Sequence, residues 1–194
     1  MTEINLTKIQ QPSAAEICSA IELDEEALAL LEEDMAPAAY LQLLIQKELY
    51  PDAVKFLAGA LPKREATWWA CLAARKSLGE AISPDDSKAI QLAEAWVYKP
   101  TPENCKAALP AAQATEFKNA AGWAAMAAFW SGDNISPVEG TIVPPPDYLT
   151  GKAVIGAVML AAAQNGFQQM KNNYRLFLKQ GIDIASGGDG RSIQ

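Results

Sequence analysis

Residues 61–79 read LPKREATWWACLAARKSLG, and this stretch decides the fold class. Its proline suits the first turn of a helix, where the missing N–H is not needed, and its last glycine is typical of the position just beyond a helix end. The spacing predicts one helix reaching Leu78. Adjacent helical residues lie about 100° apart, so Trp68 and Trp69 cannot both face the centre of one buried side. Either this helix packs on two sides, or one indole lies at the surface.

Helix signals of the same kind recur along the chain. Ser83 and Thr101 each precede a proline and an acidic first turn, a combination that suits a helix N-terminus. Residues 121–133 read AGWAAMAAFWSGD, and a helix this apolar around its circumference is normally buried. The 36 alanines let helix axes approach closely, and the five tryptophans fill the gaps between them. We predict an all-α fold, a compact bundle or stacked helix hairpins of about ten helices.

One long segment, residues 131–149, interrupts the helical pattern. Its VPPP run at 143–146 cannot be helical, because three consecutive prolines favour an extended polyproline II conformation. We expect a Pro-rich irregular strap here, followed by a helix that Thr150 caps and that continues to Ala163. The sequence leaves open whether the strap covers a functional groove or only joins two helices.

The expected domain organisation has three parts. Residues 1–12 form an N-terminal arm, and residues 13–184 form a single helical domain with a sizeable core. We expect residues 185–194 to form a disordered tail, because the run at 186–190 consists of glycine and small polar residues.

The composition excludes several kinds of site. The chain has no histidine, which is the side chain most used for acid–base catalysis and metal binding near neutral pH. Its cysteines are odd in number and far apart, so we expect reduced, buried thiols and neither a disulfide nor a zinc site. No cofactor and no metal are therefore expected. The three cysteines are Cys18, Cys71 and Cys105.

Nothing in the sequence predicts insertion into a membrane. The first residues lack the basic and apolar pattern of a signal peptide. The longest apolar run, residues 153–163, is shorter than the roughly 20 residues of a membrane span and indicates a buried helix. Together with the reduced cysteines, this predicts a cytoplasmic protein.

The charge is distributed unevenly along the chain. Residues 1–34 carry nine acids and one lysine, whereas the remaining residues carry 14 acids and 15 bases. The formal net charge of −7 therefore belongs to the first segment, and no basic stripe exists that could bind nucleic acid. The acidic segment is either a solvated helix face or a docking surface for a basic partner.

The densest group of candidate partner-binding residues lies at the start of the 61–79 helix. Arg64 lies one turn before Trp68, and an arginine over an indole is a favourable cation–π pair. We expect either an anchor of arginine and tryptophan for a partner, or a central helix whose polar first turn is fixed by salt bridges. In the 121–133 block, Trp130 is the residue best placed to reach the surface. The predicted partner-binding residues are Lys63, Arg64, Glu65, Trp68, Trp130 and Asp133, and no catalytic residue is predicted.

Four blocks carry a resemblance to a known group of proteins. LPKREATWWAC, AEAWV, AGWAAMAAFWSGDN and VPPP together resemble an uncharacterised family of small Ala- and Trp-rich helical bacterial proteins. The resemblance spans about Ala14 to Ile184, and the run from Arg64 to Cys71 is its most specific part. It implies a context near protein-secretion loci, type VI secretion among them, and it supplies no catalytic residues.

These observations favour a non-enzymatic protein-interaction module, an adaptor or accessory factor of a bacterial assembly, and the resemblance implies a link to secretion. The expected partner is another protein, with no nucleic acid and no membrane. One alternative is an immunity-type toxin inhibitor that uses the acidic N-terminal segment against a basic target. A second alternative is a histidine-independent enzyme that uses carboxylates or Cys71. The oligomeric state stays open.

Overall fold

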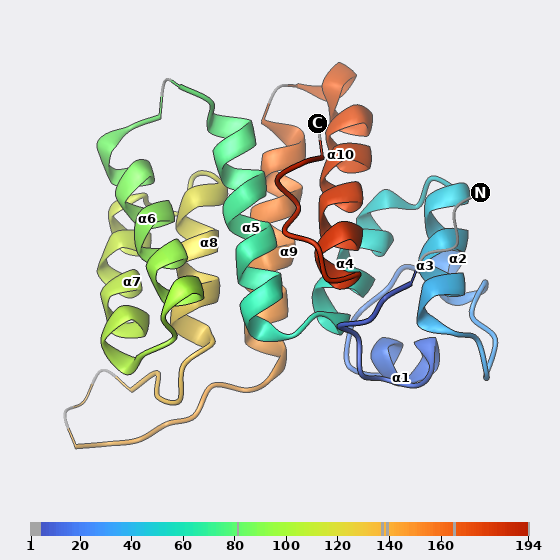
Figure 1. Cartoon of the computed structure of the whole chain (residues 1–194), viewed down its shortest axis with the longest axis horizontal. Helices are drawn as coiled ribbons and strands as arrows, with labels where there is room; N and C mark the ends of the chain where they lie inside the picture. The colour runs from blue at the N-terminus through green and yellow to red at the C-terminus, as the bar shows by residue number, and fades with distance from the viewer. Residues whose placement is uncertain (1–4, 81, 137, 139, 165, 194) are drawn as a thin grey trace.

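The computed structural model describes residues 5–80, 82–136, 138, 140–164 and 166–193, and within them helices are the only regular secondary structure (Figure 1). These residues form ten helices and no strand, which confirms the all-α prediction. In chain order the helices are α1 (Ala14–Cys18), α2 (Glu25–Leu28), α3 (Pro37–Gln46), α4 (Tyr50–Ala60), α5 (Lys63–Leu78), α6 (Pro84–Tyr98), α7 (Pro102–Ala114), α8 (Ala120–Trp130), α9 (Tyr148–Ala163) and α10 (Phe167–Ala185).

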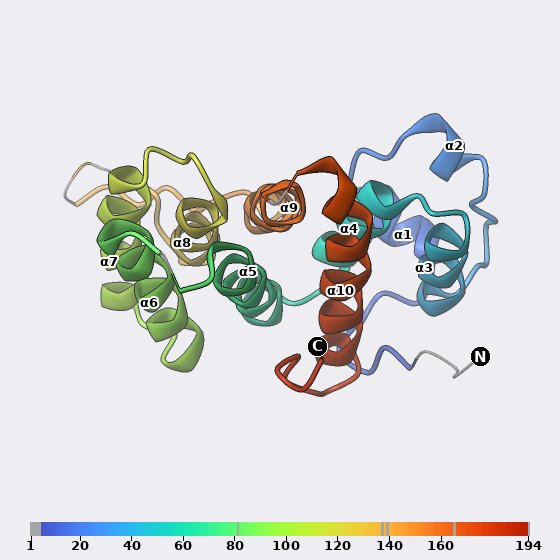
Figure 2. The same cartoon turned by 90° about the horizontal axis from the view of Figure 1, so that it is seen from above.

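Three helices form the centre of the molecule, since α5, α8 and α9 pack against one another. On one side α6 and α7 cover α8, and on the other side α4 and α10 cover α9 and α5. The helices α1 and α3 pack on α4, farthest from α7 (Figures 1 and 2). This order leaves one side of α5 open toward solvent between α6 and α10.

Small residues make the central packing close. Five alanines of α8 are fully buried, and the α9 backbone at Gly156 lies so near Trp123 that an added Cβ would meet the indole at 3.3 Å. At the crossing of α5 and α10, the fully buried Trp69 donates its indole N–H to the carbonyl of Phe177 at 2.8 Å. A Cβ on Gly181 would lie 2.8 Å from that indole, so only glycine fits there without a shift.

Local sequence signals mark the end of α5 and the starts of four helices. Gly79, with a φ of 61°, ends α5 as predicted. A polar side chain accepts a backbone N–H at the starts of α1, α6, α7 and α8, which satisfies one otherwise free donor in each helix. These capping residues are Ser13, Ser83, Thr101 and Asn119.

The predicted cap at Thr150 is wrong. The α9 helix begins at Tyr148, so the strap ends at residue 147 and Thr150 lies inside the first turn. The prolines hold the chain extended only as far as Pro146, and the helix begins as soon as that constraint is gone. The hydroxyl of Thr150 is buried and lies 3.1 Å from the hydroxyl of Ser131, where it joins α9 to the end of α8.

The prediction of a disordered tail also differs from the structure, in which the described part of this segment is packed against the helices. Helix α10 continues to Ala185, and residues 186–193 fold back over α5 and α6, while Gln194 lies outside the described residues. Glycine makes this reversal possible, because Gly187 and Gly190 have φ values of 97° and 70°. Of the N-terminal arm, residues 1–4 lie outside the described residues, and Lys8 donates its backbone N–H to the carbonyl of Ala185 at 2.8 Å.

Candidate functional site

The partly exposed Trp68 lies on the open side of α5, in a cleft of about 290 Å³. The neighbouring Trp69 is fully buried, so the helix points one indole inward and one outward, as the sequence allowed. We call this hollow the Trp68 cleft. It is lined by Lys8, Arg64, Glu65, Trp68, Val97, Tyr98, Ile184, Gly187, Gly188, Asp189 and Arg191.

The C-terminal segment of the chain forms one wall of the Trp68 cleft and packs on Trp68. Trp68 donates its indole N–H to the carbonyl of Asp189 at 2.8 Å. The guanidinium of Arg191 lies 4.8 Å from the centre of the Trp68 ring and donates a hydrogen bond to the hydroxyl of Tyr98. The Trp68 and Tyr98 rings lie 5.9 Å apart at a tilt of 54°. Trp68 and Tyr98 thus hold one backbone carbonyl and one arginine side chain of a short segment that lines the cleft.

The turn that brings this segment into the cleft depends on Asp183 and Gly190. The Asp183 carboxylate accepts the backbone N–H of Gly190 at 2.8 Å. Gly190 is buried, and a Cβ there would lie 2.8 Å from the side chain of Leu72. A Cβ on Gly188 would collide with the Asp183 carboxylate. The glycines that predicted disorder are therefore the residues that permit this packed turn.

Two of the predicted partner-binding residues, Arg64 and Glu65, lie beside Trp68, but each contacts another segment of the chain. Arg64 donates its Nε–H to the carbonyl of Val97 at 2.6 Å, at the C-terminal end of α6, where a cation is favoured. The expected stacking of Arg64 over Trp68 is wrong, because Arg191 takes that place. Glu65 lies 3.6 Å from the amine of Lys8 and joins α5 to the N-terminal arm.

The remaining predicted residues lie outside the Trp68 cleft, so the structure does not gather the predicted set into one surface. Lys63 forms an ion pair with Asp147 at 3.2 Å and lines a different cavity. Trp130 is partly buried against the core at the end of α8, and Asp133 is exposed just beyond it. Spacing along single helices could not reveal this separation, because it depends on how α5 and α8 cross.

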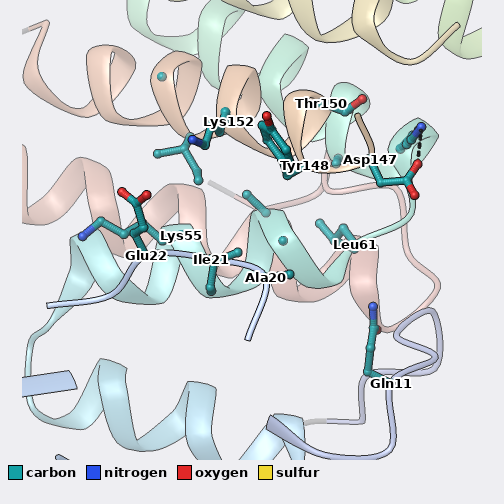
Figure 3. Close-up of a pocket in the computed structure, with 17 residues that line it drawn as sticks. Gln11, Ala20, Ile21, Glu22, Lys55, Leu61, Asp147, Tyr148, Thr150 and Lys152 are labelled. Atoms are coloured by element: carbon teal, nitrogen blue, oxygen red, sulfur yellow. Dashed lines mark hydrogen bonds and ion pairs between the residues drawn. The ribbon is translucent and has the colours of Figure 1, made fainter. Parts of the chain in front are cut away.

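A second and larger hollow of about 740 Å³ lies between α4 and α9 (Figure 3). We call it the α4–α9 cavity. Its apolar lining comes from α4, α5, α9 and the segment after α1, and it includes Ile21, Ala58, Leu61 and Ile155. Sequence reasoning missed this cavity, because its walls come from segments far apart in the chain. Its size is within the usual range for small-molecule sites.

The cysteines are free and buried. Burial raises the pKa of Cys18 to about 11, and burial also raises the pKa values of Cys71 and Cys105. A buried thiol with a raised pKa stays protonated and is a poor nucleophile. Within the described ranges, no group of three or more Cys, Asp or Glu side chains is arranged to hold a metal ion.

A model of a family of unknown function, DUF6931, matches residues 40–185. The chain belongs to this family. The DUF6931 match begins in α3 and ends with α10, so it includes Trp68 and Tyr98 but neither Arg191 nor the acidic residues before position 40. No curated protein and no solved structure matches the chain. Among the described residues, no helix combines the length and apolar character that a membrane span requires.

Proposed function

We propose that this DUF6931 protein is a non-enzymatic protein-interaction module that binds an extended, arginine-bearing segment of a partner in the Trp68 cleft. The observation that carries the proposal is the contact of residues 189–191 with Trp68 at the wall of the cleft, where they present a backbone carbonyl to its indole N–H and a guanidinium to its ring. Tryptophan and arginine are the residues on which binding energy concentrates in protein interfaces. The C-terminal segment then acts as an internal occupant that a partner must replace.

The energies involved are compatible with such an exchange. A cation–π contact at an exposed site contributes about 0.5–1 kcal/mol, and a single hydrogen bond contributes about 0.5–1.5 kcal/mol. The tethered segment gains from its high effective concentration, in the millimolar range for short linkers. A partner that repeats these contacts and adds a few more can therefore displace residues 189–191.

The wider role belongs to the same proposal. An adaptor or accessory factor of a bacterial assembly, associated with secretion, is the role that the sequence resemblance favours. A cytoplasmic location agrees with three free thiols. Neither a nucleic acid nor a membrane is a proposed partner, because the chain is acidic and its one strongly charged segment is negative.

A second candidate function, the immunity-type inhibitor, is favoured by the exposure of the N-terminal acids. Eight of the nine acids before position 35 are exposed, and the ninth, Glu3, lies outside the described residues. Of those eight, Asp24 forms an ion pair with Lys55 at 2.9 Å. Exposed like charges of this density would steer a basic target, with association that slows as salt screens them.

The first proposal is tested by affinity capture from lysate of the source organism with three forms of the protein. We expect the Arg191→Gln variant to recover more of a given partner than the wild type, because it weakens the internal occupant. The Trp68→Ala variant should recover little, and Phe167→Ala, at an exposed aromatic residue outside the cleft, serves as the control that recovers the wild-type amount. Equal recovery by Trp68→Ala and wild type would overturn the proposal, provided that circular dichroism shows a folded variant.

The inhibitor alternative needs a different variant. Deleting residues 1–34 would also remove the buried side chains of Ile17 and Ala27, so a loss of binding would not report on charge. Converting four exposed glutamates to glutamine keeps the core intact. If the fourfold variant protects against a basic toxin as well as the wild type does, the acidic surface has no such role. The four residues are Glu25, Glu26, Glu32 and Glu33.

A further inference from the structure

The C-terminal segment contains a chemically reactive pair of residues. Asp189 is the only aspartate of the chain that a glycine follows. In an Asp–Gly pair the main-chain nitrogen of the glycine can attack the side-chain carboxyl carbon, because a five-membered ring forms and glycine has no Cβ to obstruct the approach. Asp189 is exposed and Gly190 is buried, so the pair lies where the packed segment meets water. It is therefore a candidate site of spontaneous modification.

The modification needs only water and leaves the mass of the chain unchanged. A C–N bond forms between the Gly190 nitrogen and Cγ of Asp189, while the carboxyl O–H takes up the amide proton and leaves as water. Water then opens the succinimide ring. Attack at Cγ restores aspartate, whereas attack at the α-carbonyl gives isoaspartate. In isoaspartate the main chain runs through Cβ and Cγ, so it gains one atom, and the α-carboxylate becomes the side group.

In the packed turn, Asp183 binds the nitrogen that would have to attack. Its carboxylate accepts the N–H of Gly190 at 2.8 Å. The attacking nitrogen must lose this proton, and a negative carboxylate beside it opposes that loss. A Cβ on Gly188 would collide with the same carboxylate, so the turn closes directly over Asp183. The contact that holds the turn thus also blocks the reaction.

Both polar groups of Asp189 are fixed as well. Its carbonyl accepts the indole N–H of Trp68 at 2.8 Å, and its carboxylate accepts the backbone N–H of Arg191 at 3.0 Å. Attack by Gly190 requires rotation about the bonds of Asp189, which would break these hydrogen bonds. The reaction is therefore blocked while residues 189–191 are packed on Trp68, and it becomes possible when they are released.

An isomerised segment does not fit back into the turn. Gly190 is packed so closely that even an added Cβ would lie 2.8 Å from the side chain of Leu72. The additional main-chain atom lies between the carbonyl that Trp68 binds and the N–H that Asp183 binds. Hydrogen bonds need donor and acceptor within a few tenths of an ångström of their usual distance, so the two cannot form together.

We propose that Asp189–Gly190 is a site of spontaneous isoaspartate formation, which Asp183 blocks while the C-terminal segment is packed on Trp68, and which keeps the segment released once it has occurred. The consequence for binding rests on the proposed function. A partner that displaces residues 189–191 also frees the reactive pair, and the reacted chain can no longer cover Trp68 with its own C-terminal segment.

Prolonged incubation of the full chain at neutral pH tests the block. Trypsin then releases residues 180–191, and chromatography with mass spectrometry separates the isoaspartate form of this peptide from the aspartate form of equal mass. The same chain unfolded in guanidinium chloride gives the unblocked rate. We expect isoaspartate to form at least about tenfold more slowly in the folded chain, because a hydrogen bond to a charged group must first break. Equal rates in the folded and the unfolded chain would overturn the proposal.

Variants of the folded chain assign the block to Asp183. Asp183→Ala should raise the rate about tenfold, and Asp183→Asn, which keeps an oxygen acceptor but loses the charge, should lie between it and the wild type. Asp189→Glu should give no such product, because its ring would have six members. Asp34→Ala, at an exposed acid outside the turn, is the matched control and should react as the wild type does. A wild-type rate in both Asp183 variants would overturn the proposal.

A chain with isoaspartate at position 189, made by semisynthesis, tests the loss of packing. We expect the indole N–H of Trp68 to exchange faster with solvent in this chain than in the unmodified one. The indole N–H of Trp69, bonded to Phe177 in the core, should exchange as before. Equal exchange at Trp68 would overturn the proposal. None of these measurements involves a partner, so their failure would leave the proposed function standing, and failed capture of a partner would leave their results unchanged.

Discussion

The guanidinium of Arg191 lies 4.8 Å from the centre of the Trp68 ring, although Trp68 belongs to α5 and Arg191 follows the last helix. The hydrogen bond from the Trp68 indole to the carbonyl of Asp189 fixes the same segment a second time. A tryptophan that would otherwise be exposed is therefore covered by the chain's own C-terminal residues. This contact therefore covers the surface that we propose as a recognition site.

Removing the cation of this contact should loosen the C-terminal segment and leave the core unchanged. We expect Arg191→Gln to lower the unfolding free energy by about 0.5–1 kcal/mol, the usual size of an exposed cation–π contact. In NMR spectra the indole N–H of Trp68 should exchange faster with solvent. The indole N–H of Trp69, bonded to Phe177 inside the core, is the internal control. Unchanged exchange at Trp68 would show that Arg191 does not hold the segment.

Adding one methyl group at the crossing of α5 and α10 should destabilise the fold. A Cβ on Gly181 would lie 2.7 Å from Leu57 and 2.8 Å from Trp69, both fully buried. We expect Gly181→Ala to cost about 1–3 kcal/mol in chemical denaturation, despite the better helix propensity of alanine. Gly151→Ala is the matched control, since its Cβ would meet its nearest neighbour at 3.4 Å. It should be neutral or slightly stabilising, and equal losses in the two variants would contradict the packing argument.

Stability should fall at alkaline pH because of the buried thiols. Burial raises the pKa of Cys18 from 9.0 to about 11. Above about pH 9 the unfolded chain releases the thiol proton while the folded chain keeps it, so the unfolding free energy decreases between about pH 9 and 11. Urea unfolding from pH 7 to 10.5 measures this slope. Cys18→Ala should make it shallower, and an unchanged slope would exclude Cys18 as a source. The remainder belongs to Cys71, Cys105, Tyr40 and Tyr174, whose pKa values burial also raises.

The ion pair between α5 and α6 should contribute more to the unfolding free energy than the fully exposed ion pairs do. Arg75 binds both oxygens of Glu94, at 2.5 and 2.6 Å, and the Glu94 side chain is only 14 % exposed. We expect Glu94→Gln to lower the unfolding free energy by about 1 kcal/mol, because bidentate pairs are the strong ones. The pair of Lys118 and Glu116 is about 70 % exposed on both sides, so Glu116→Gln should cost at most about 0.5 kcal/mol. Equal losses of unfolding free energy in Glu94→Gln and Glu116→Gln would show that the burial of Glu94 does not strengthen its ion pair.

Much of the fold could be predicted from local sequence because its signals act over a few residues. Ser83 and Thr101 cap helices where predicted, since a capping hydroxyl reaches an N–H only three residues ahead. Gly79 ends α5 for the same local reason. The prediction at Thr150 failed because α8 offered its hydroxyl another partner, Ser131, that the local sequence does not reveal.

The candidate sites could be predicted only in part. The two adjacent tryptophans left two outcomes open, a helix packed on two sides or an indole at the surface. The structure has the second, with a partly exposed Trp68. The partner of its ring could not be predicted, because Arg64 has the right spacing on the helix and Arg191 does not. Arg64 donates instead to the backbone carbonyl of Val97, and the glycine turn places Arg191 over the Trp68 ring.

The sequence by itself determined the helices, their caps and the alanine-rich faces that let α5, α8 and α9 approach, because those properties depend on side-chain volume and on neighbours within one turn. Only the tertiary structure decided what covers Trp68 and where the α4–α9 cavity opens. Such features arise where segments distant in the chain meet, and the geometry of that meeting is set by the packing of the whole core.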